Sequence, residues 1–208
     1  MTGRIVREAA FQGVGCINAE SSMRTLEFFP VHVTPAFPSS SYGCQLQKEI
    51  AMTPRMTDHF KRIGGAFQGL VTFETELLKG PLEHSLLHLV KLRASQINGC
   101  AFCIQIHAAD ALKNGETHLR LHMVAGWHDS TLFTPRERAA LAWTEALTLV
   151  AETHAPDDVW EEVSTVFDKD EVAFLTFAIG AINLWNRTQI AFRAMHSLEL
   201  PVERAHAA

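Results

Sequence analysis

The chain has 208 residues, of which 47% are hydrophobic and 20% charged, and its formal net charge is −5. This composition is typical of one globular domain with a single core. No cluster of Lys and Arg stands out, and no uncharged apolar run approaches the roughly 20 residues of a membrane span, so neither nucleic acid nor a membrane is an expected partner. A secretory signal is not evident, and four cysteines do not resemble a secreted disulfide framework, so we expect a cytoplasmic protein.

The first 51 residues differ from the rest of the chain. They contain scattered glycines and prolines and the serine run 39–41, with no sustained helical period. We interpret residues 1–51 as an N-terminal extension, poorly ordered or loosely docked, that precedes one domain over residues 52–208. Met52 or Met56 would be an equally good natural start, because helical patterning begins just after them.

From residue 57 onward, apolar residues recur at helical spacing and almost no strand pattern is found. The prediction is an all-α fold with about seven helices. Thr57 or Asp58 caps the first helix and Gly80 ends it, and the others cover about residues 82–97, 100–113, 117–126, 135–152, 157–167 and 169–195.

Two of these helix starts carry capping boxes, in which the first residue and the glutamate three positions later satisfy each other's backbone N–H groups. They are Thr134 with Glu137, and Asp168 with Glu171. The last helix is apolar almost all round, which is typical of a helix at the centre of a core or in a subunit interface. Its polar residues Asn183, Asn186 and Arg187 are expected to hydrogen-bond across the core or to contact another subunit.

A C-x-x-C-x-x-x-H motif lies at the centre of the chain and consists of Cys100, Cys103 and His107. The turn signal Asn98-Gly99 precedes it, which places Cys100 near a helix N-terminus, where backbone N–H groups favour a thiolate. Cys103 and His107 are spaced i, i+4 and share one helix face. The motif is suited to thiol redox chemistry or to metal binding.

In the redox interpretation, a nucleophilic thiol, a resolving thiol and a proton-transfer group act together. Cys103 with His107 fits the nucleophile and its base, and Cys100 then fits the resolving thiol. The residues alone leave the reverse order of the two thiols open, because a thiol at a helix N-terminus is often the more acidic one.

In the metal interpretation, Cys100, Cys103 and His107 supply three zinc ligands, and His88 or His128 supplies the fourth. Structural zinc sites often pair two ligand couples with short spacings, and the sequence has no second C-x-x-C couple. We therefore favour redox chemistry over zinc, and also over two buried structural cysteines beside a hydrogen-bonded histidine.

Three segments carry a family resemblance: SQINGCAFCIQIHAADALKNGE (95–116), FTPRERAALAWTEALT (133–148) and INLWNRTQIAFR (182–193). They resemble the alkylhydroperoxidase D-like group of the carboxymuconolactone decarboxylase superfamily, over about residues 53–195. The resemblance implies an all-helical fold and homo-oligomers, often trimers or hexamers. It also implies a thiol peroxidase in which Cys103 is peroxidatic, Cys100 resolves, and His107 belongs to a proton relay.

One position departs from the family pattern. The relay of the family usually includes a glutamate twelve residues before the first cysteine, and here that position is His88. A histidine transfers protons near pH 7, so His88 is a candidate relay residue, and an inert surface histidine is the alternative. The family's well-known member also has a histidine between the cysteines, where this chain has Phe102.

The resemblance therefore implies an antioxidant enzyme that reduces an organic hydroperoxide through a Cys100–Cys103 dithiol/disulfide cycle. No bound cofactor is required, and a thioredoxin-like or lipoyl-bearing protein is expected to reduce the disulfide again. The alternatives are a carboxymuconolactone decarboxylase-type enzyme, and a non-catalytic oligomer that binds zinc or senses redox state.

Overall fold

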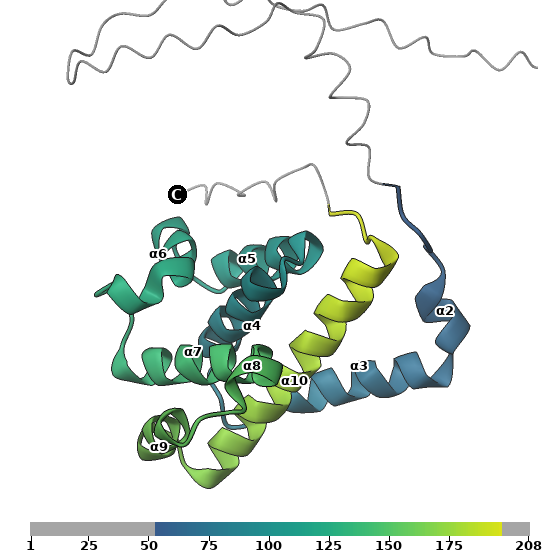
Figure 1. Ribbon diagram of the computed structural model, residues 1–208. Helices are drawn as coiled ribbons and strands as arrows, with labels where there is room; N and C mark the ends of the chain where they lie inside the picture. Colours follow the sequence, from purple (N-terminus) through teal and green to yellow (C-terminus); the bar gives the residue numbers. More distant parts are fainter. Residues whose placement is uncertain (1–52, 197–208) are drawn as a thin grey trace, which may run out of the picture. The chain divides into compact units, whose positions relative to one another are not determined.

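A computed structural model of the chain describes residues 53–196, so the predicted extension over residues 1–51 lies outside the described part. These described residues form nine α-helices and one 3-10 helix and contain no strand (Figure 1), which confirms the predicted all-α fold. The helices are α2 (His59–Ile63), α3 (Gly65–Leu78), α4 (His84–Asn98), α5 (Ala101–Lys113), α6 (His118–Met123), η1 (Val124–Asp129), α7 (Pro135–Thr148), α8 (Val150–Thr153), α9 (Asp157–Val166) and α10 (Lys169–Phe192).

Three of the predicted helices are each broken into two, which is why the structure has more helices than the sequence pattern predicts. Gly64 separates α2 from α3 with a φ of 49°, a conformation that a residue without a Cβ adopts at little cost. Helix α6 ends at Met123, where the chain continues as the 3-10 helix η1 from Val124, and Leu149 separates α7 from α8. The apolar spacing continues across these breaks, so periodicity alone does not reveal them.

Both predicted capping boxes are confirmed. The Thr134 side chain accepts a hydrogen bond from the Glu137 backbone N–H, and the Glu137 carboxylate accepts one from the Thr134 N–H. Asp168 and Glu171 form the same reciprocal pair at the start of α10. These contacts fix where α7 and α10 begin, because they satisfy backbone donors that the helix itself leaves unpaired.

Helix α4 is the central element of the helical unit and packs against α5, α7 and α10 (Figure 1). One core cluster lies between α4, α7, α9 and α10, and a second lies between α4, α5, α6, η1 and α7. A third, smaller cluster contains Cys100, Cys103, Ala94 and Ile182, with Phe102 and Trp185 against it. The two cysteines are thus built into a contact between α4, α5 and α10.

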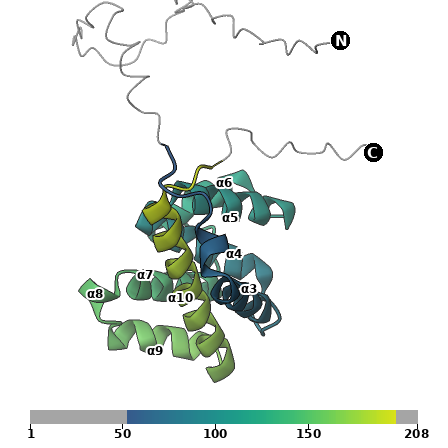
Figure 2. The ribbon, with the colours of Figure 1, turned by 90° about the vertical axis from the view of Figure 1, so that its right-hand side faces the viewer.

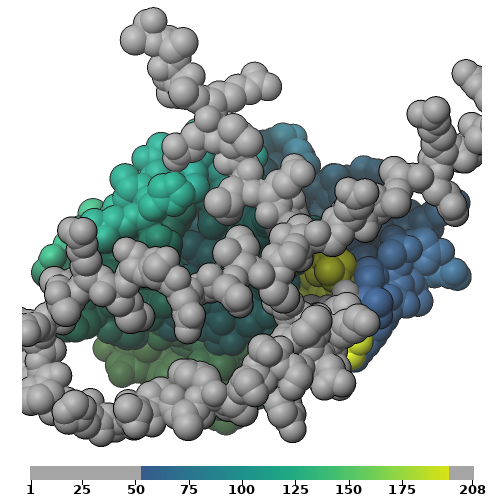
Figure 3. Space-filling model, turned by 90° about the horizontal axis from the view of Figure 1, so that it is seen from above, coloured from purple at the N-terminus to yellow at the C-terminus, as the bar shows by residue number. Residues whose placement is uncertain are grey.

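Helix α10 buries one face in the core and leaves an apolar face uncovered, as the 61% exposure of Phe177 shows. Helices α3 and α10 lie side by side in both ribbon views (Figures 1 and 2). Seen from above, the yellow end of α10 lies beside the blue residues of α2 (Figure 3), where the His59 and Phe192 rings stack with centroids 4.5 Å apart. None of the helices between residues 53 and 196 combines the length and apolar character that crossing a membrane requires.

Candidate functional site

The turn between α4 and α5 places Cys100 at the N-terminus of α5. Gly99 adopts a left-handed conformation with a φ of 71°, and the backbone N–H of Cys100 donates to the Ser95 carbonyl at 3.0 Å. This hydrogen bond and the one from Gly99 N–H to the Gln96 carbonyl close a Schellman motif, which glycine favours because it has no Cβ. The predicted turn and the predicted position of Cys100 are both confirmed.

Side-chain amides attach this turn to α10. Asn98 Nδ2 donates to Oδ1 of Asn183 and to Oδ1 of Asn186, each at 2.9 Å. Asn186 is fully buried, and its own Nδ2 donates to Ser95 Oγ at 3.0 Å. Asn183 and Asn186 therefore hydrogen-bond across the core, as the sequence predicted, and they hold the segment that carries Cys100.

Cys100 and Cys103 form a disulfide, with their Cα atoms 5.4 Å apart. Both residues are buried, and the Cys103 backbone N–H donates to Cys100 Sγ at 3.4 Å. When the disulfide is reduced, this donor and the helix N-terminus favour the thiolate of Cys100. A disulfide between these residues is one of the two states that a dithiol/disulfide cycle requires.

A cavity of about 330 Å³ adjoins Cys103 and is mainly apolar. Helices α2, α3, α4, α5 and α10 contribute its walls, and Cys103 lines it whereas Cys100 does not. The lining side chains are Phe60, Phe67, Val71, Glu74, Lys91, Phe102, Ile106, His107, Ile182, Trp185 and Gln189. A small molecule in this cavity therefore contacts Cys103 and not Cys100.

His107 lines the same cavity one helical turn after Cys103. Burial lowers the pKa of His107 to about 3, with further lowering by the charges of Lys91 and His88, while Asp110 opposes the shift. The imidazole is therefore neutral at pH 7. In that form it offers a lone pair that accepts a proton, but it brings no positive charge to the thiol.

His88 lies outside the residues that line the Cys103 cavity. Its Nε2 accepts a hydrogen bond from Asn114 Nδ2 at 3.2 Å, and burial lowers its pKa. His88 acts on His107 electrostatically, as its contribution to the pKa of His107 shows. The structure thus places Cys103, which is bonded to Cys100, and His107 at one cavity. His88 lies outside this cavity, beside Asn114 at the C-terminal end of α5.

A largely buried ion pair in the wall of the cavity was not predicted from the sequence. Lys91 Nζ lies 2.6 Å from Glu74 Oε2, and Trp185 Nε1 donates to Glu74 Oε1 at 2.8 Å. The three side chains come from α4, α3 and α10, so no local motif relates them. The one available signal was Lys91 itself, a charged residue among the apolar residues of α4.

The alternative zinc site is not assembled in the described part of the chain. Between residues 53 and 196, no three His, Cys, Asp or Glu side chains lie where they could hold a metal ion. His88 contacts Asn114, and His128 Nε2 lies 3.1 Å from Glu145 Oε2. A zinc ion on the two cysteines and His107 would need one of these histidines to leave its present partner.

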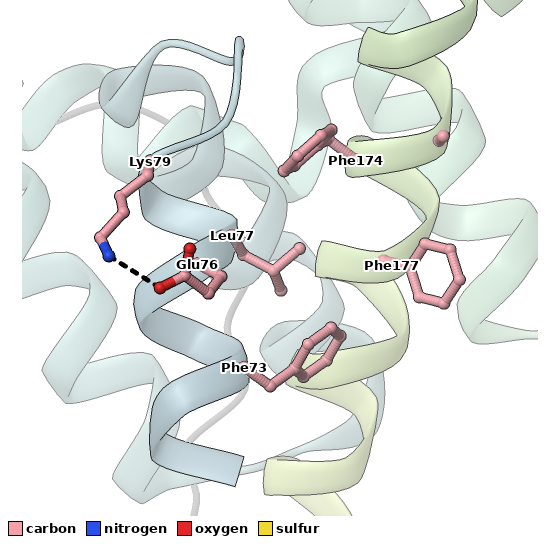
Figure 4. A pocket seen from close by; sticks show the side chains of 7 residues that line it. Phe73, Glu76, Leu77, Lys79, Phe174 and Phe177 are labelled. Atoms are coloured by element: carbon pink, nitrogen blue, oxygen red, sulfur yellow. Dashed lines mark hydrogen bonds and ion pairs between the residues drawn. The ribbon is translucent and has the colours of Figure 1, made fainter. Parts of the chain in front are cut away.

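A second cavity, of about 470 Å³, lies between α3 and α10 (Figure 4). Leu77 of α3 and Phe174 of α10 face each other across it, and Glu76 and Lys79 form an ion pair at its edge. Neither a thiol nor a histidine lines this cavity. Its larger volume therefore does not make it the site of chemistry.

Comparison with known proteins gives relatives for most of this helical unit. The model of the carboxymuconolactone decarboxylase family matches residues 65–146. The uncharacterized protein YdfG of Bacillus subtilis is 35% identical over 122 residues, which are 59% of this chain and 83% of YdfG.

Two solved structures have similar folds. One is a protein of unknown function from Agrobacterium tumefaciens, described as a candidate antioxidant defence protein AhpD; it is 39% identical, with a TM-score of 0.68 over 71% of this chain and 100% of that protein. The other is an uncharacterized peroxidase-related protein with an alkylhydroperoxidase AhpD core from Ralstonia eutropha, with 16% identity and a TM-score of 0.61 over 76% of this chain and 84% of that one. At this lower identity the likeness concerns the fold alone.

Proposed function

Because the chain belongs to the carboxymuconolactone decarboxylase family, we propose that it is a thiol peroxidase that reduces an organic hydroperoxide through a Cys100–Cys103 dithiol/disulfide cycle. The observation that carries this proposal is the position of Cys103. It lines an apolar cavity beside the neutral His107 and is bonded to Cys100, which lies behind it. This arrangement has the substrate space, the attacking thiol, the base and the resolving thiol that such a cycle needs.

In the first step, the Cys103 thiol gives its proton to the neutral His107, and the thiolate attacks the terminal oxygen of the hydroperoxide. The S–O bond forms as the O–O bond breaks. The leaving alkoxide takes the proton back from His107 and departs as an alcohol, and Cys103 becomes a sulfenic acid. The apolar walls favour a hydroperoxide with an apolar organic group, because such a group gains free energy when it leaves water.

In the second step, the Cys100 thiol attacks the Cys103 sulfur, so the disulfide forms and water leaves. A dithiol reductant, from a thioredoxin-like or a lipoyl-bearing protein, then attacks the Cys103 sulfur through the cavity. Cys100 departs as a thiolate, to which the Cys103 backbone N–H is already directed. The lining of the cavity, which includes Cys103 but not Cys100, supports this direction of attack.

We also propose that His88 is a more distant member of the proton relay, and its electrostatic effect on His107 supports this role. The enzyme works as a homo-oligomer in this proposal, and the uncovered apolar face of α10 is the surface available for such contacts.

The test uses reduced protein in which Cys16 and Cys44 are replaced by serine, so that only the two site thiols remain. Addition of cumene hydroperoxide should remove two thiols and about two mass units per chain through disulfide formation. In Cys100→Ser, dimedone should label a sulfenic acid on Cys103, and in Cys103→Ser neither reaction should occur. A Cys103→Ser protein that consumes peroxide as fast as the parent contradicts the proposal.

The family match keeps one alternative open, a decarboxylase that acts on a lactone. Such an enzyme does not need two thiols. Turnover of carboxymuconolactone by a Cys100→Ser/Cys103→Ser double variant, together with no peroxide reaction in the parent, would favour it.

A further inference from the structure

We propose that the Lys91–Glu74 ion pair controls the ionisation of Cys103, with Lys91 stabilising the thiolate and Glu74 limiting that effect. The inference rests on the proposed function only in assigning the thiolate a use, since the ionisation of Cys103 is measurable without any peroxide. It adds two residues to the site, neither of which belongs to the C-x-x-C-x-x-x-H motif.

The pair is buried in the wall of the Cys103 cavity. The Lys91 and Glu74 side chains are 9% and 19% exposed, and their charged atoms are 2.6 Å apart. Trp185 Nε1 donates to the second carboxylate oxygen of Glu74 at 2.8 Å, which fixes the carboxylate. Lys91 itself lines the cavity. An ammonium group has three donors, so Lys91 has further protons to direct at an anion after it binds Glu74.

Few of the side chains that line the cavity carry a charge. Helix α5 contributes His107, which is neutral because burial lowers its pKa to about 3, and Asp110 and His88 influence that ring from α5 and α4. Helix α10 contributes the uncharged Trp185 and Gln189, and α2 contributes Phe60. The charged side chains are Glu74 on α3 and Lys91 on α4. Among the residues that line this cavity, Lys91 is therefore the single cation and Glu74 the single anion.

A buried thiol does not ionise easily, because an apolar environment disfavours the charged form. With a pKa of about 3, the imidazole of His107 does not keep at pH 7 the proton that it accepts, so it gives the thiolate no lasting positive partner. Lys91 supplies a positive charge in the same cavity, and Glu74 competes with the thiolate for it. The two members of the pair therefore have opposite effects on Cys103, which a purely structural ion pair would not have.

The experiment measures the pH at which half of Cys103 is thiolate. Full-length protein with Cys16, Cys44 and Cys100 replaced by serine is reduced, and its rate of reaction with iodoacetamide is followed from pH 5 to pH 10. Lys91→Met should raise this midpoint by about 1 to 2 pH units, because an opposite charge close to a titrating group shifts it by that order. Glu74→Gln should lower the midpoint, because Lys91 then has one competitor fewer.

Three further variants separate charge from folding. Lys91→Arg keeps the cation and should return the midpoint close to that of the parent. The double variant Lys91→Met/Glu74→Gln removes both charges and leaves neither unpaired, so it should fold more readily than Lys91→Met alone. Because it also lacks the cation, its midpoint should be raised. Glu76→Gln is the matched control, because Glu76 also lies on α3 and pairs with Lys79 at 2.7 Å. This pair is more than 60% exposed and lines the other cavity, so the midpoint should not change.

Shifts of Lys91→Met and Glu74→Gln in the same direction, or no shift in the double variant, would overturn the inference. Opposite shifts in a protein that fails to react with hydroperoxide would support the inference and refute the peroxidase. The two proposals are thus tested separately.

Discussion

The side-chain amide of Asn98 donates a 2.9 Å hydrogen bond to Oδ1 of Asn186, and this bond joins the turn that carries Cys100 to the middle of α10. The two residues are 88 positions apart in the chain. The thiol motif is local in sequence, but its position is set by a distant helix.

Replacing Asn98 with alanine should destabilise the protein by about 1–3 kcal/mol, because it leaves buried amide oxygens of Asn183 and Asn186 with one donor fewer. Urea unfolding measures this change. The exposed Gln68 on α3 is the control, and Gln68→Ala should change the free energy of unfolding by less than about 0.5 kcal/mol. Equal stabilities of the two variants would show that the Asn98 contacts contribute little.

The partly buried His107 should make the protein less stable in mild acid. Its pKa is about 3 in the folded state and 6.5 when unperturbed, so between these values the unfolded chain binds a proton that the folded chain does not. The free energy of unfolding should therefore fall as the pH falls from 6.5 toward 3, by at most about 1.4 kcal/mol per pH unit for this group.

The His107 contribution is isolated by comparison with His107→Gln, which cannot titrate. The difference in unfolding free energy between the two proteins should be constant above pH 7 and should shrink below pH 6.5. The burial of His88 lowers its pKa in the same direction, but that contribution is present in both proteins and cancels. A difference that does not vary with pH would mean that the pKa of His107 is the same in the folded and unfolded states.

His88 is expected to affect the rate of the peroxide reaction but not the reactivity of the thiol itself. If it relays protons to His107, His88→Gln should slow the loss of thiols with cumene hydroperoxide several-fold and alter its pH profile between pH 6 and 8. Asn114→Ala removes the hydrogen bond to Nε2 of His88 and should produce a smaller change of the same kind. An unchanged rate in both variants would leave His88 as a surface residue without a catalytic role.

Two residues of α10 should respond differently to substitution. Leu175 is fully buried in the first core cluster, so Leu175→Ala should cost about 2–5 kcal/mol in urea unfolding. Phe177 is 61% exposed on the opposite face, so Phe177→Ser should change the stability of a monomer by less than about 1 kcal/mol.

Analytical ultracentrifugation of Phe177→Ser tests the expected homo-oligomer at the same time. If copies of the chain meet through this face of α10, the variant should sediment as a smaller species than the parent. Identical sedimentation of the two proteins would place the subunit contact on another surface.

The helical class and the local geometry of the motif follow from the amino-acid sequence alone. Periodic apolar residues, the capping boxes at Thr134 and Asp168, and the turn at Gly99 depend on interactions between residues a few positions apart. The same holds for the position of Cys100 at the start of α5 and for the shared face of Cys103 and His107. Such features can be predicted from the sequence because each depends on residues within about one helical turn of one another.

The set of residues that share a cavity depends on how the helices pack. Glu74, Lys91 and Trp185 stand on three helices and come together because α3 and α4 both pack against α10. The same packing lines the cavity with Cys103 and leaves Cys100 and His88 outside it. These relations depend on how whole helices are arranged, and helix packing is set by the sum of many weak contacts across the core, so no spacing within a single segment encodes them.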